Sequence, residues 1–340
     1  MKTEKEIEEL IDSVKIPSDE EVEAAGRRFD KRIRQIRRRR QFAWGTGSVA
    51  AVLLCGVIFV LLQPKEEVQE QTSVLPVVKT ENEVTAPTLI LSDGNSVNLN
   101  DGQTDTMLRR SNIQLADKHI KYDTTPAVRE VAYNTLVIPT GFTYDVTLAD
   151  GTLATLNAGS RLKYPETFVG EQREVELEGE GFFNVEKSEK PFVVKVLESR
   201  IRVYGTRFNV KTSPRKTVET VLVEGRIGFK SPGQDEVQVV PGQQVAYNPE
   251  SGFVSIEQVD VRYAIAWLKG VFKYQDKPLN FILEDLSTWY GVTFEPRVDV
   301  TGIKITMNLS KKTSIDEVIA FLKLMTNREF IEERGNYIIE

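Results

Sequence analysis

The chain has 340 residues, and its 44 Lys and Arg against 50 Asp and Glu give a net charge of -6 at pH 7. Its single Cys and single His exclude an intrachain disulfide and leave a zinc site or a His-dependent triad without its usual groups. We therefore expect no metal, no cofactor and no direct binding of nucleic acid. The one His, His119, is interpreted as a solvated loop residue.

Residues 1–41 are predicted to form a short helical segment. Pro17 separates two stretches with helical spacing, and Ser18 with Glu21 forms a capping box for the second. So few residues bury little core alone, so we expect the segment to fold as helices in a groove of a partner protein. The alternative is a disordered tail that merges into a membrane-surface helix. The candidate binding residues are Ile7, Leu10, Ile11, Val14, Val22, Phe29 and Ile33.

Residues 42–63 are predicted to form one transmembrane helix. From Phe42 to Leu62 the only polar side chains are Thr46 and Ser48, and about 20 apolar residues cross a bilayer core. Arg37 to Arg40 precede the span, so the positive-inside rule keeps the N-terminus in the cytoplasm and exports the C-terminus. A cleaved signal peptide is the alternative, but the late start and the lack of a cleavage signature argue against it.

A stripe of small residues recurs every fourth position in this span. Such a stripe either allows two spans to approach closely in a homodimer or is the ordinary composition of a membrane helix. The residues are Ala43, Gly47, Ala51 and Cys55.

Residues 64–86 read as a linker, and residues 87–260 as a mostly β domain of the sandwich or roll type. Leu89–Asn100 and Val146–Asn157 each carry strand, Asp-Gly turn and strand, which predicts a repeated hairpin. Further strands are predicted at 173–177, 192–196, 200–204, 208–210, 218–223, 226–229, 237–239 and 244–247.

The motifs of this β domain resemble the FecR family in sequence and in order. They are Asp145–Thr152, Leu156–Pro165, Arg173–Val185, Pro191–Val194 and Gly205–Val210. The resemblance implies a single-pass inner-membrane regulator of a Gram-negative bacterium. Its implied partners are an extracytoplasmic-function sigma factor inside, the signalling domain of a TonB-dependent outer-membrane transducer outside, membrane proteases, and the lipid around the span.

One departure from the family is the short cytoplasmic segment, since many members carry a larger anti-sigma domain. If these residues bind no sigma factor, the chain is instead a membrane-anchored periplasmic interaction module. A glycan-cleaving enzyme would need two placed carboxylates. Glu178 and Glu180 lie in a structural motif, which disfavours that class.

The resemblance also draws attention to Gly205-Thr206, because some FecR-like regulators cleave themselves at a Gly-Thr bond in this domain. The Thr206 hydroxyl would attack the Gly205 carbonyl if a strained turn held it in line. The alternative is an ordinary turn before a strand, and otherwise the chain is expected not to be an enzyme. The same motifs predict that Phe182, Phe183, Phe192 and Phe208 fill the core between sheets.

Residues 261–340 are predicted to form a small α+β domain of two βαβ-like units, which resembles the C-terminal domain that follows FecR in many regulators. Ser314 with Glu317 predicts a second capping box, and an open sheet edge would give a transducer strand a place to pair. The predicted helices carry Leu279, Ile282, Leu283, Leu286 and Tyr290, and then Ile315, Val318, Ile319, Leu322 and Met325.

Overall fold

The computed structural model describes residues 84–100, 113–116, 119–122, 132–213 and 217–340, which lie in one compact unit. The predicted cytoplasmic segment, the span and most of the linker lie outside these ranges. Among the helices that are described, none is long and apolar enough to cross a membrane.

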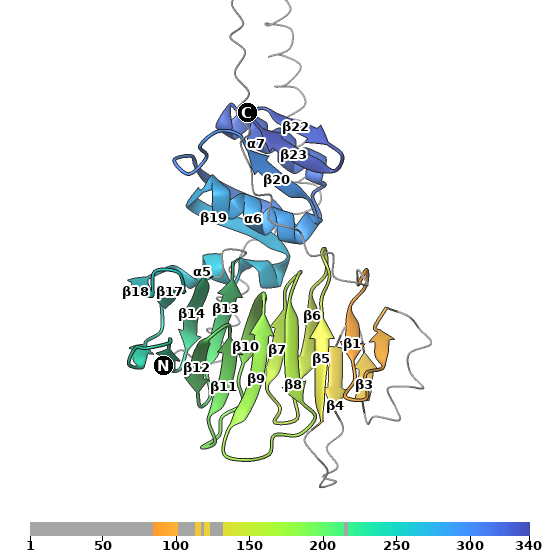
Figure 1. The fold of residues 1–340 in the computed structure, drawn as a ribbon, viewed down its shortest axis with the longest axis vertical. Coiled ribbons are helices and arrows are strands. Elements are labelled where there is room, and N and C mark those ends of the chain that lie inside the picture. Colours follow the sequence, from red (N-terminus) through yellow and green to blue (C-terminus); the bar gives the residue numbers. More distant parts are fainter. Residues whose placement is uncertain (1–83, 101–112, 117–118, 123–131, 214–216) are drawn as a thin grey trace, which may run out of the picture. The chain divides into compact units, whose positions relative to one another are not determined.

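The residues up to Gln258 form two large sheets (Figure 1). The first contains β1 (Thr88–Ile90), β2 (Ser96–Asn98), β5 (Tyr133–Val137), β8 (Arg161–Pro165), β9 (Arg173–Glu178), β11 (Phe192–Val196), β12 (Ser199–Val203), β15 (Ile227–Lys230) and β16 (Val237–Val239). The second contains β3 (Ile113–Ala116), β4 (His119–Tyr122), β6 (Tyr144–Thr147), β7 (Leu153–Leu156), β10 (Glu180–Asn184), β13 (Arg207–Thr212), β14 (Val218–Glu224), β17 (Gln243–Asn248) and β18 (Phe253–Gln258).

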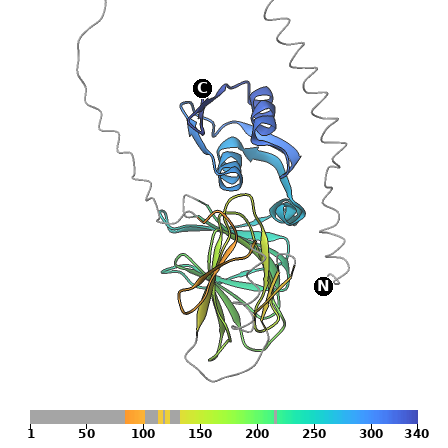
Figure 2. The same cartoon turned by 90° about the vertical axis from the view of Figure 1, so that its right-hand side faces the viewer.

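We call these sheet A and sheet B. Sheet A has the strand order β16-β15-β12-β11-β9-β8-β5-β1-β2, and sheet B has the order β18-β17-β14-β13-β10-β7-β6-β4-β3. Their strands are antiparallel apart from the β9–β11 and β4–β6 pairs. The two sheets face each other (Figure 2), so this part of the chain is a β-sandwich.

Alternating side chains of both sheets meet in the core of the sandwich. Phe183 of β10 stacks on Phe208 of β13 at 5.4 Å between ring centroids and lies 6.1 Å from Phe192 of β11. All three are fully buried, as predicted. Phe182 alternates to the other face of sheet B, where it packs with Trp267, so its predicted place between the sheets is wrong.

The repeated hairpin is confirmed. β1 pairs with β2 and β6 with β7, both antiparallel. Each turn closes alike, since the N–H of Gly94 or Gly151 donates to the carbonyl three residues before it. The aspartate before each glycine accepts the N–H two residues on. The first hairpin lies in sheet A and the second in sheet B, a difference that tertiary pairing decides.

The chain crosses repeatedly from one sheet to the other at corners that contain glycine. Gly179 lies between β9 and β10, Gly205 between β12 and β13, and Gly225 between β14 and β15. All three have positive φ, the region that glycine occupies without strain. A Cβ on Gly179 would lie 2.6 Å from the Ser160 hydroxyl of the β7–β8 corner, so neighbouring corners pack closely.

Two local predictions differ from the structure. His119 is the first residue of β4 and is half-buried, and its Nε2 lies 2.6 Å from the Thr147 hydroxyl. It is therefore not a loop residue, because the parallel pairing of β4 with β6 orders a segment that has no strand pattern of its own. The second is β10, a strand that was not predicted because glycines interrupt its alternation.

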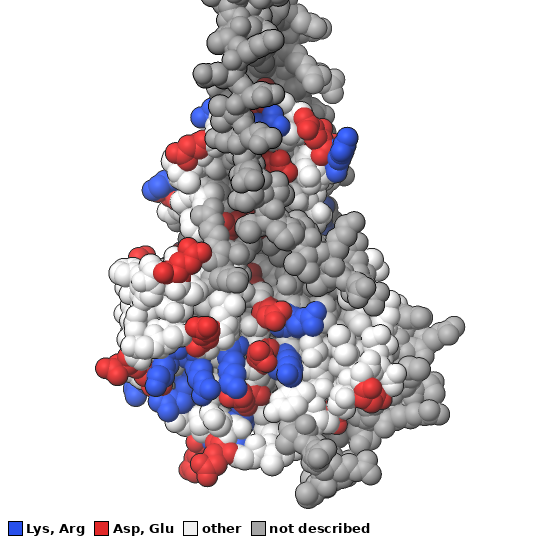
Figure 3. All heavy atoms as spheres, viewed as in Figure 1, with Lys and Arg blue, Asp and Glu red and all other residues white. Residues whose placement is uncertain are grey.

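The outward face of sheet A carries a band of basic side chains (Figure 3). The register sets Lys195 of β11 opposite Arg200 of β12, and Arg200 opposite Lys230 of β15. Lys195 is paired with Glu174 at 2.6 Å. Cations directly opposite one another repel, so this face disfavours the stacking of a second sheet with the same charge.

The remaining residues form the α+β domain. Its elements are α5 (Val261–Ala264), the 3-10 helix η1 (Ala266–Lys269), β19 (Val271–Pro278), α6 (Leu279–Tyr290), β20 (Thr293–Pro296), β21 (Lys304–Ser310), α7 (Ile315–Thr326), β22 (Phe330–Glu333) and β23 (Asn336–Ile339). The predicted order of strands and helices is present, and the pairing of the last two strands, β22 with β23, is as predicted. The two strands that flank each helix do not pair with each other. β19 pairs with β21, and β20 pairs with β23, which also pairs with β22.

The predicted signals at the helix ends are confirmed. Ser314 and Glu317 form the capping box of α7, and Gly291 ends α6 in the left-handed conformation. The predicted apolar stripes pack in the domain core, with Tyr290 and Ile315 partly buried, whereas Met325 is 50% exposed.

Candidate functional site

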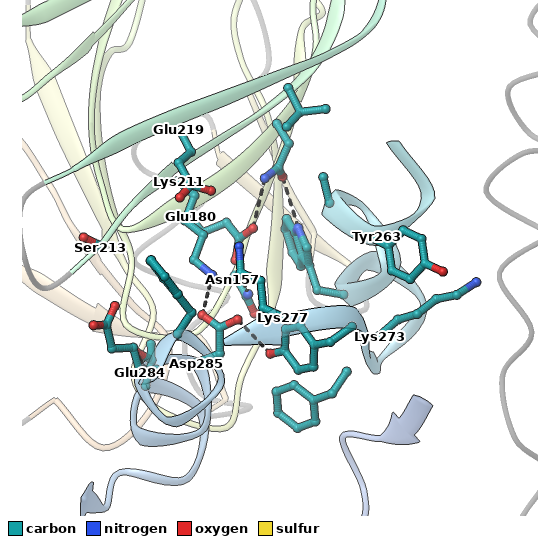
Figure 4. A pocket seen from close by; sticks show the side chains of 18 of the residues that line it. Asn157, Glu180, Lys211, Ser213, Glu219, Tyr263, Lys273, Lys277, Glu284 and Asp285 are labelled. Carbon is teal, nitrogen blue, oxygen red and sulfur yellow. Dashed lines mark hydrogen bonds and ion pairs between the residues drawn. The ribbon is translucent and has the colours of Figure 1, made fainter. Parts of the chain in front are cut away.

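A partly enclosed polar site lies where the α+β domain meets the end of the sandwich. A cavity of about 720 Å³ opens there, lined by both parts (Figure 4). We call the contacts that surround it the junction. The junction residues are Asn157, Glu180, Asn209 and Lys211 of the sandwich and Trp267, Tyr274, Asp285 and Lys311 of the α+β domain.

The connection between the two domains is held by Trp267 of η1. Its indole N–H donates to Asn209 Oδ1 at 3.0 Å, and its ring packs with Phe182 and Val223 on the outer face of sheet B. Asn209 in turn donates to Glu180 Oε1 at 2.9 Å. The segment after β18 is therefore a fixed bridge rather than a free hinge.

A partly buried ion pair forms the second contact. The ammonium of Lys211 donates to Asp285 Oδ1, and the Tyr274 hydroxyl donates to Asp285 Oδ2 at 2.7 Å. Burial alone would lower the pKa of Lys211, but the carboxylates of Asp285 and Glu180 outweigh it and raise that pKa. Burial and the nearby Asp285 also raise the pKa of Tyr274 well above its usual value. Lys211 therefore stays charged and Tyr274 neutral at physiological pH.

Lys311, just after β21, forms the third contact. Its ammonium lies 4.0 Å from the centre of the Trp289 ring, 5.4 Å from that of Phe272 and 5.9 Å from that of Trp267. It donates to Asn157 Oδ1 at 2.8 Å. The Lys311 cation is therefore surrounded by three aromatic rings of its own domain and by one amide oxygen of the sandwich.

This lysine is only 7% exposed, and its burial lowers its pKa to about 8. The carboxylates of Glu180 and Asp285 oppose that shift, whereas the charge of Lys211 adds to it. The four charged groups face one another from β10, β13, α6 and the end of β21. The two carboxylates therefore favour the charged forms of both lysines, and the two lysines disfavour each other's charge.

Sequence reasoning did not predict the junction. Asn157 and Glu180 were identified only as residues of turn motifs, and Trp267 and Lys311 gave no pattern. A usable signal was the presence of Trp267 and Trp289, because a buried tryptophan usually lies where its N–H finds an acceptor.

The Gly205-Thr206 peptide bond lies at the opposite side of the corner from Gly225. The Thr206 hydroxyl is buried and donates to the Arg226 carbonyl at 3.2 Å. A Cβ on Gly225 would lie 2.7 Å from that hydroxyl and 2.9 Å from the Gly205 carbonyl oxygen. Thr206 precedes β13 directly, so this bond has the same architectural place as the other glycine corners.

The predicted sigma-binding side chains all lie outside the described residues. These are Ile7, Leu10, Ile11, Val14, Val22, Phe29 and Ile33. The four small residues of the predicted span lie outside them as well.

Comparison with known proteins gives matches on both sides of the junction. The family model for the FecR protein matches residues 134–228, and the model for the FecR C-terminal domain matches residues 271–340. Two crystal structures of a proposed anti-sigma factor from Parabacteroides distasonis ATCC 8503, at 1.65 and 2.50 Å resolution, are similar to the chain. The identities are 27% and 26%, the TM-score is 0.56 for both, and each covers 61% of this chain and 98% of the solved one. No curated protein matches the chain.

Proposed function

Because the chain belongs to the FecR family of anti-sigma factors, we propose that it carries a signal from a TonB-dependent outer-membrane transducer to an extracytoplasmic-function sigma factor. Residues 1–41 bind the sigma factor in the cytoplasm, residues 42–63 cross the inner membrane, and the sandwich and α+β domain lie in the periplasm. The basic run before the apolar segment supports this orientation.

The transducer contact is assigned to the α+β domain. β22 pairs with β23 alone among the described strands, so its other edge offers unpaired backbone groups to a strand of the transducer. Ile331 on this edge strand is 41% exposed, and Leu324 and Met325 of α7 are exposed as well. An open edge next to exposed apolar side chains is typical of a strand-pairing surface.

The junction is the observation that carries the proposal. The domain that contacts the transducer is held to the sandwich through a few polar contacts, namely those of Lys311, Asp285 and Trp267. A transducer that binds the α+β domain better when it is released shifts the junction toward its open form. Opening exposes the segment between β18 and β19 to a periplasmic protease, and cleavage of the span then frees residues 1–41 with the sigma factor.

The first experiment is a deletion of residues 1–41 that keeps the span and both exported domains, followed by sequencing of cellular RNA. Constitutive transcription of one outer-membrane transporter operon is expected for an inhibitor, and loss of induction for an activator. No change would contradict regulation of a sigma factor. The chain would then be a membrane-anchored periplasmic interaction module, the second candidate function.

A pull-down with residues 1–41 in a membrane mimic separates these two functions directly. Capture of a sigma factor supports the regulator. A variant with Leu10 and Phe29 changed to Asp is the matched control, because it keeps the length of the segment and removes one apolar anchor from each predicted helix.

For Gly205-Thr206 we propose a structural corner rather than a self-cleavage site. The Thr206 hydroxyl donates to a main-chain carbonyl, which accepts the hydrogen bond but takes up no proton. The expected result is one full-length species in the intact mass spectrum of the purified chain. A pair of fragments that end at Gly205 and begin at Thr206 would overturn this assignment.

A further inference from the structure

The edge strands of the two sheets differ in length and protection. Among the described residues, sheet A ends at β16 and β2, each of three residues, and sheet B ends at the four-residue β3 and the six-residue β18. An edge strand has one row of backbone groups without a strand partner, and proteins commonly keep such edges short. β18 is the exception here.

β18 also carries few of the side chains that protect an edge, with Glu257 as its one charged residue. Its sequence, Phe253–Gln258, contains no Lys, Arg or Pro. It pairs with β17 over six consecutive residues without a bulge. Phe253 is 65% exposed and Ile256 is 40% exposed. An edge strand that has no bulge and exposes apolar side chains favours pairing with another strand.

We propose that β18 is a self-association surface, to which the β18 strand of a second copy of this chain adds in antiparallel orientation. The two strands are related by a two-fold axis perpendicular to the sheet. Residues that lie opposite one another therefore point to the same face of the joined sheet. With the axis at Ser255, Val254 lies opposite Ile256 of the second copy, which gives two apolar pairs on the inward face.

On the outward face, the same register sets Phe253 opposite Glu257 of the second copy. Glu257, the one carboxylate of the strand, therefore does not lie opposite Glu257 of the second copy. Ser255 lies opposite Ser255 of the second copy. Shifting the axis to Glu257 would bring two carboxylates together. This charge pattern favours a second copy as the occupant of the edge.

The surroundings direct the association to this edge. The basic band on sheet A repels an identical face, which leaves an edge-to-edge contact. A single strand pair buries less than the roughly 1,200 Å² of a stable interface. Copies anchored in one membrane share a high effective concentration, so a contact of this size suffices there. The proposed dimer therefore depends on the anchor, and the experiment uses the full chain in membranes.

Cysteine crosslinking tests the register. Cys55, the only native thiol, is replaced by Ala, and Ser255→Cys is introduced at the proposed axis. Residues directly opposite in an antiparallel pair have Cα atoms about 4.5 to 5.5 Å apart, within the range of a disulfide. We expect a covalent dimer under mild oxidation of membranes that contain the full-length chain.

Ser251→Cys is the matched control, because it lies in the turn before the same strand and is exposed. In the proposed register its two copies are about 27 Å apart, since each strand residue advances the chain by about 3.4 Å. Adding Ile256→Lys to the Ser255→Cys chain is expected to lower the dimer fraction about tenfold, which corresponds to about 1.4 kcal/mol of association.

Two results would overturn the proposal. One is no dimer from Ser255→Cys, and the other is equal crosslinking of Ser255→Cys and Ser251→Cys, which indicates random collision. Circular dichroism of each variant verifies that the sandwich is folded. Because the readout is a covalent dimer and not transcription, this test is independent of whether residues 1–41 bind a sigma factor.

Discussion

Lys311 and Trp289 contact each other twice. The Lys311 ammonium lies 4.0 Å from the centre of the Trp289 ring, and the Trp289 indole N–H donates to the Lys311 carbonyl at 3.1 Å. Both the main chain and the side chain of Lys311 therefore contact α6, which carries Trp289. Since the same ammonium reaches Asn157, this pair couples the position of α6 to the sandwich.

Lys311→Ala is expected to destabilise the junction. The change removes an ammonium from three aromatic faces and takes away one of the two donors to Asn157 Oδ1, which keeps the Ala158 N–H, at a cost of about 1–2 kcal/mol. The adjacent Lys312→Ala is the control, because Lys312 is exposed. Thermal unfolding of the two variants of the full chain measures the difference, and equal melting temperatures would contradict the role of Lys311.

The stability of the wild-type chain is expected to rise with pH above pH 8. The folded-state pKa of Lys311 is about 8, below the usual 10.5, so between these values the unfolded chain binds the proton that the folded chain has lost. The gain is about 1–2 kcal/mol between about pH 7.5 and about pH 9.5, and below that window the contribution is constant. Groups with raised pKa values, Lys211 and Tyr274, act only above pH 10.

Lys311→Met tests whether Lys311 causes this pH dependence, because methionine keeps most of the side-chain volume and cannot titrate. Urea unfolding at several pH values should show a flat profile across the window for this variant. A rise as steep as that of the wild type would assign the pH dependence to another group.

Asp285→Asn is expected to cost about 1–2 kcal/mol. The change removes the counter-ion of Lys211 and weakens the acceptor of the Tyr274 hydroxyl. The side chains of Lys211 and Asp285 are 31% and 21% exposed, so solvent screens part of the lost attraction. Asp276→Asn is the control, since Asp276 pairs with Lys304 at the surface. It should change the free energy of unfolding by less than about 0.5 kcal/mol.

Gly225→Ala is expected to be more damaging than Gly170→Ala. Both glycines have positive φ, +97° and +84°, so both variants share the conformational cost of about 1 kcal/mol. Only the Cβ at position 225 meets other atoms, namely Thr206 Oγ1 at 2.7 Å and the Gly205 carbonyl oxygen at 2.9 Å. The difference between their free energies of unfolding isolates that clash, and similar values would mean that the corner relaxes freely.

The sequence alone determined the local structure of this protein. The Asp-Gly hairpins, the Ser314 and Glu317 capping box and the buried stripes of α6 and α7 depend on residues close together in the chain, so short-range geometry specifies them. The order of the motifs also indicates the FecR family, because those motifs combine turn residues and core residues at fixed spacings.

Only the tertiary structure decided which elements meet. The two similar hairpins lie in different sheets, β19 pairs with β21 rather than with β20, and Phe182 faces Trp267 instead of the sandwich core. The junction brings Lys311 to Asn157, which is 154 positions away in the chain. No periodicity encodes a contact at that separation, because it depends on how two independently patterned domains bury their remaining surfaces against each other.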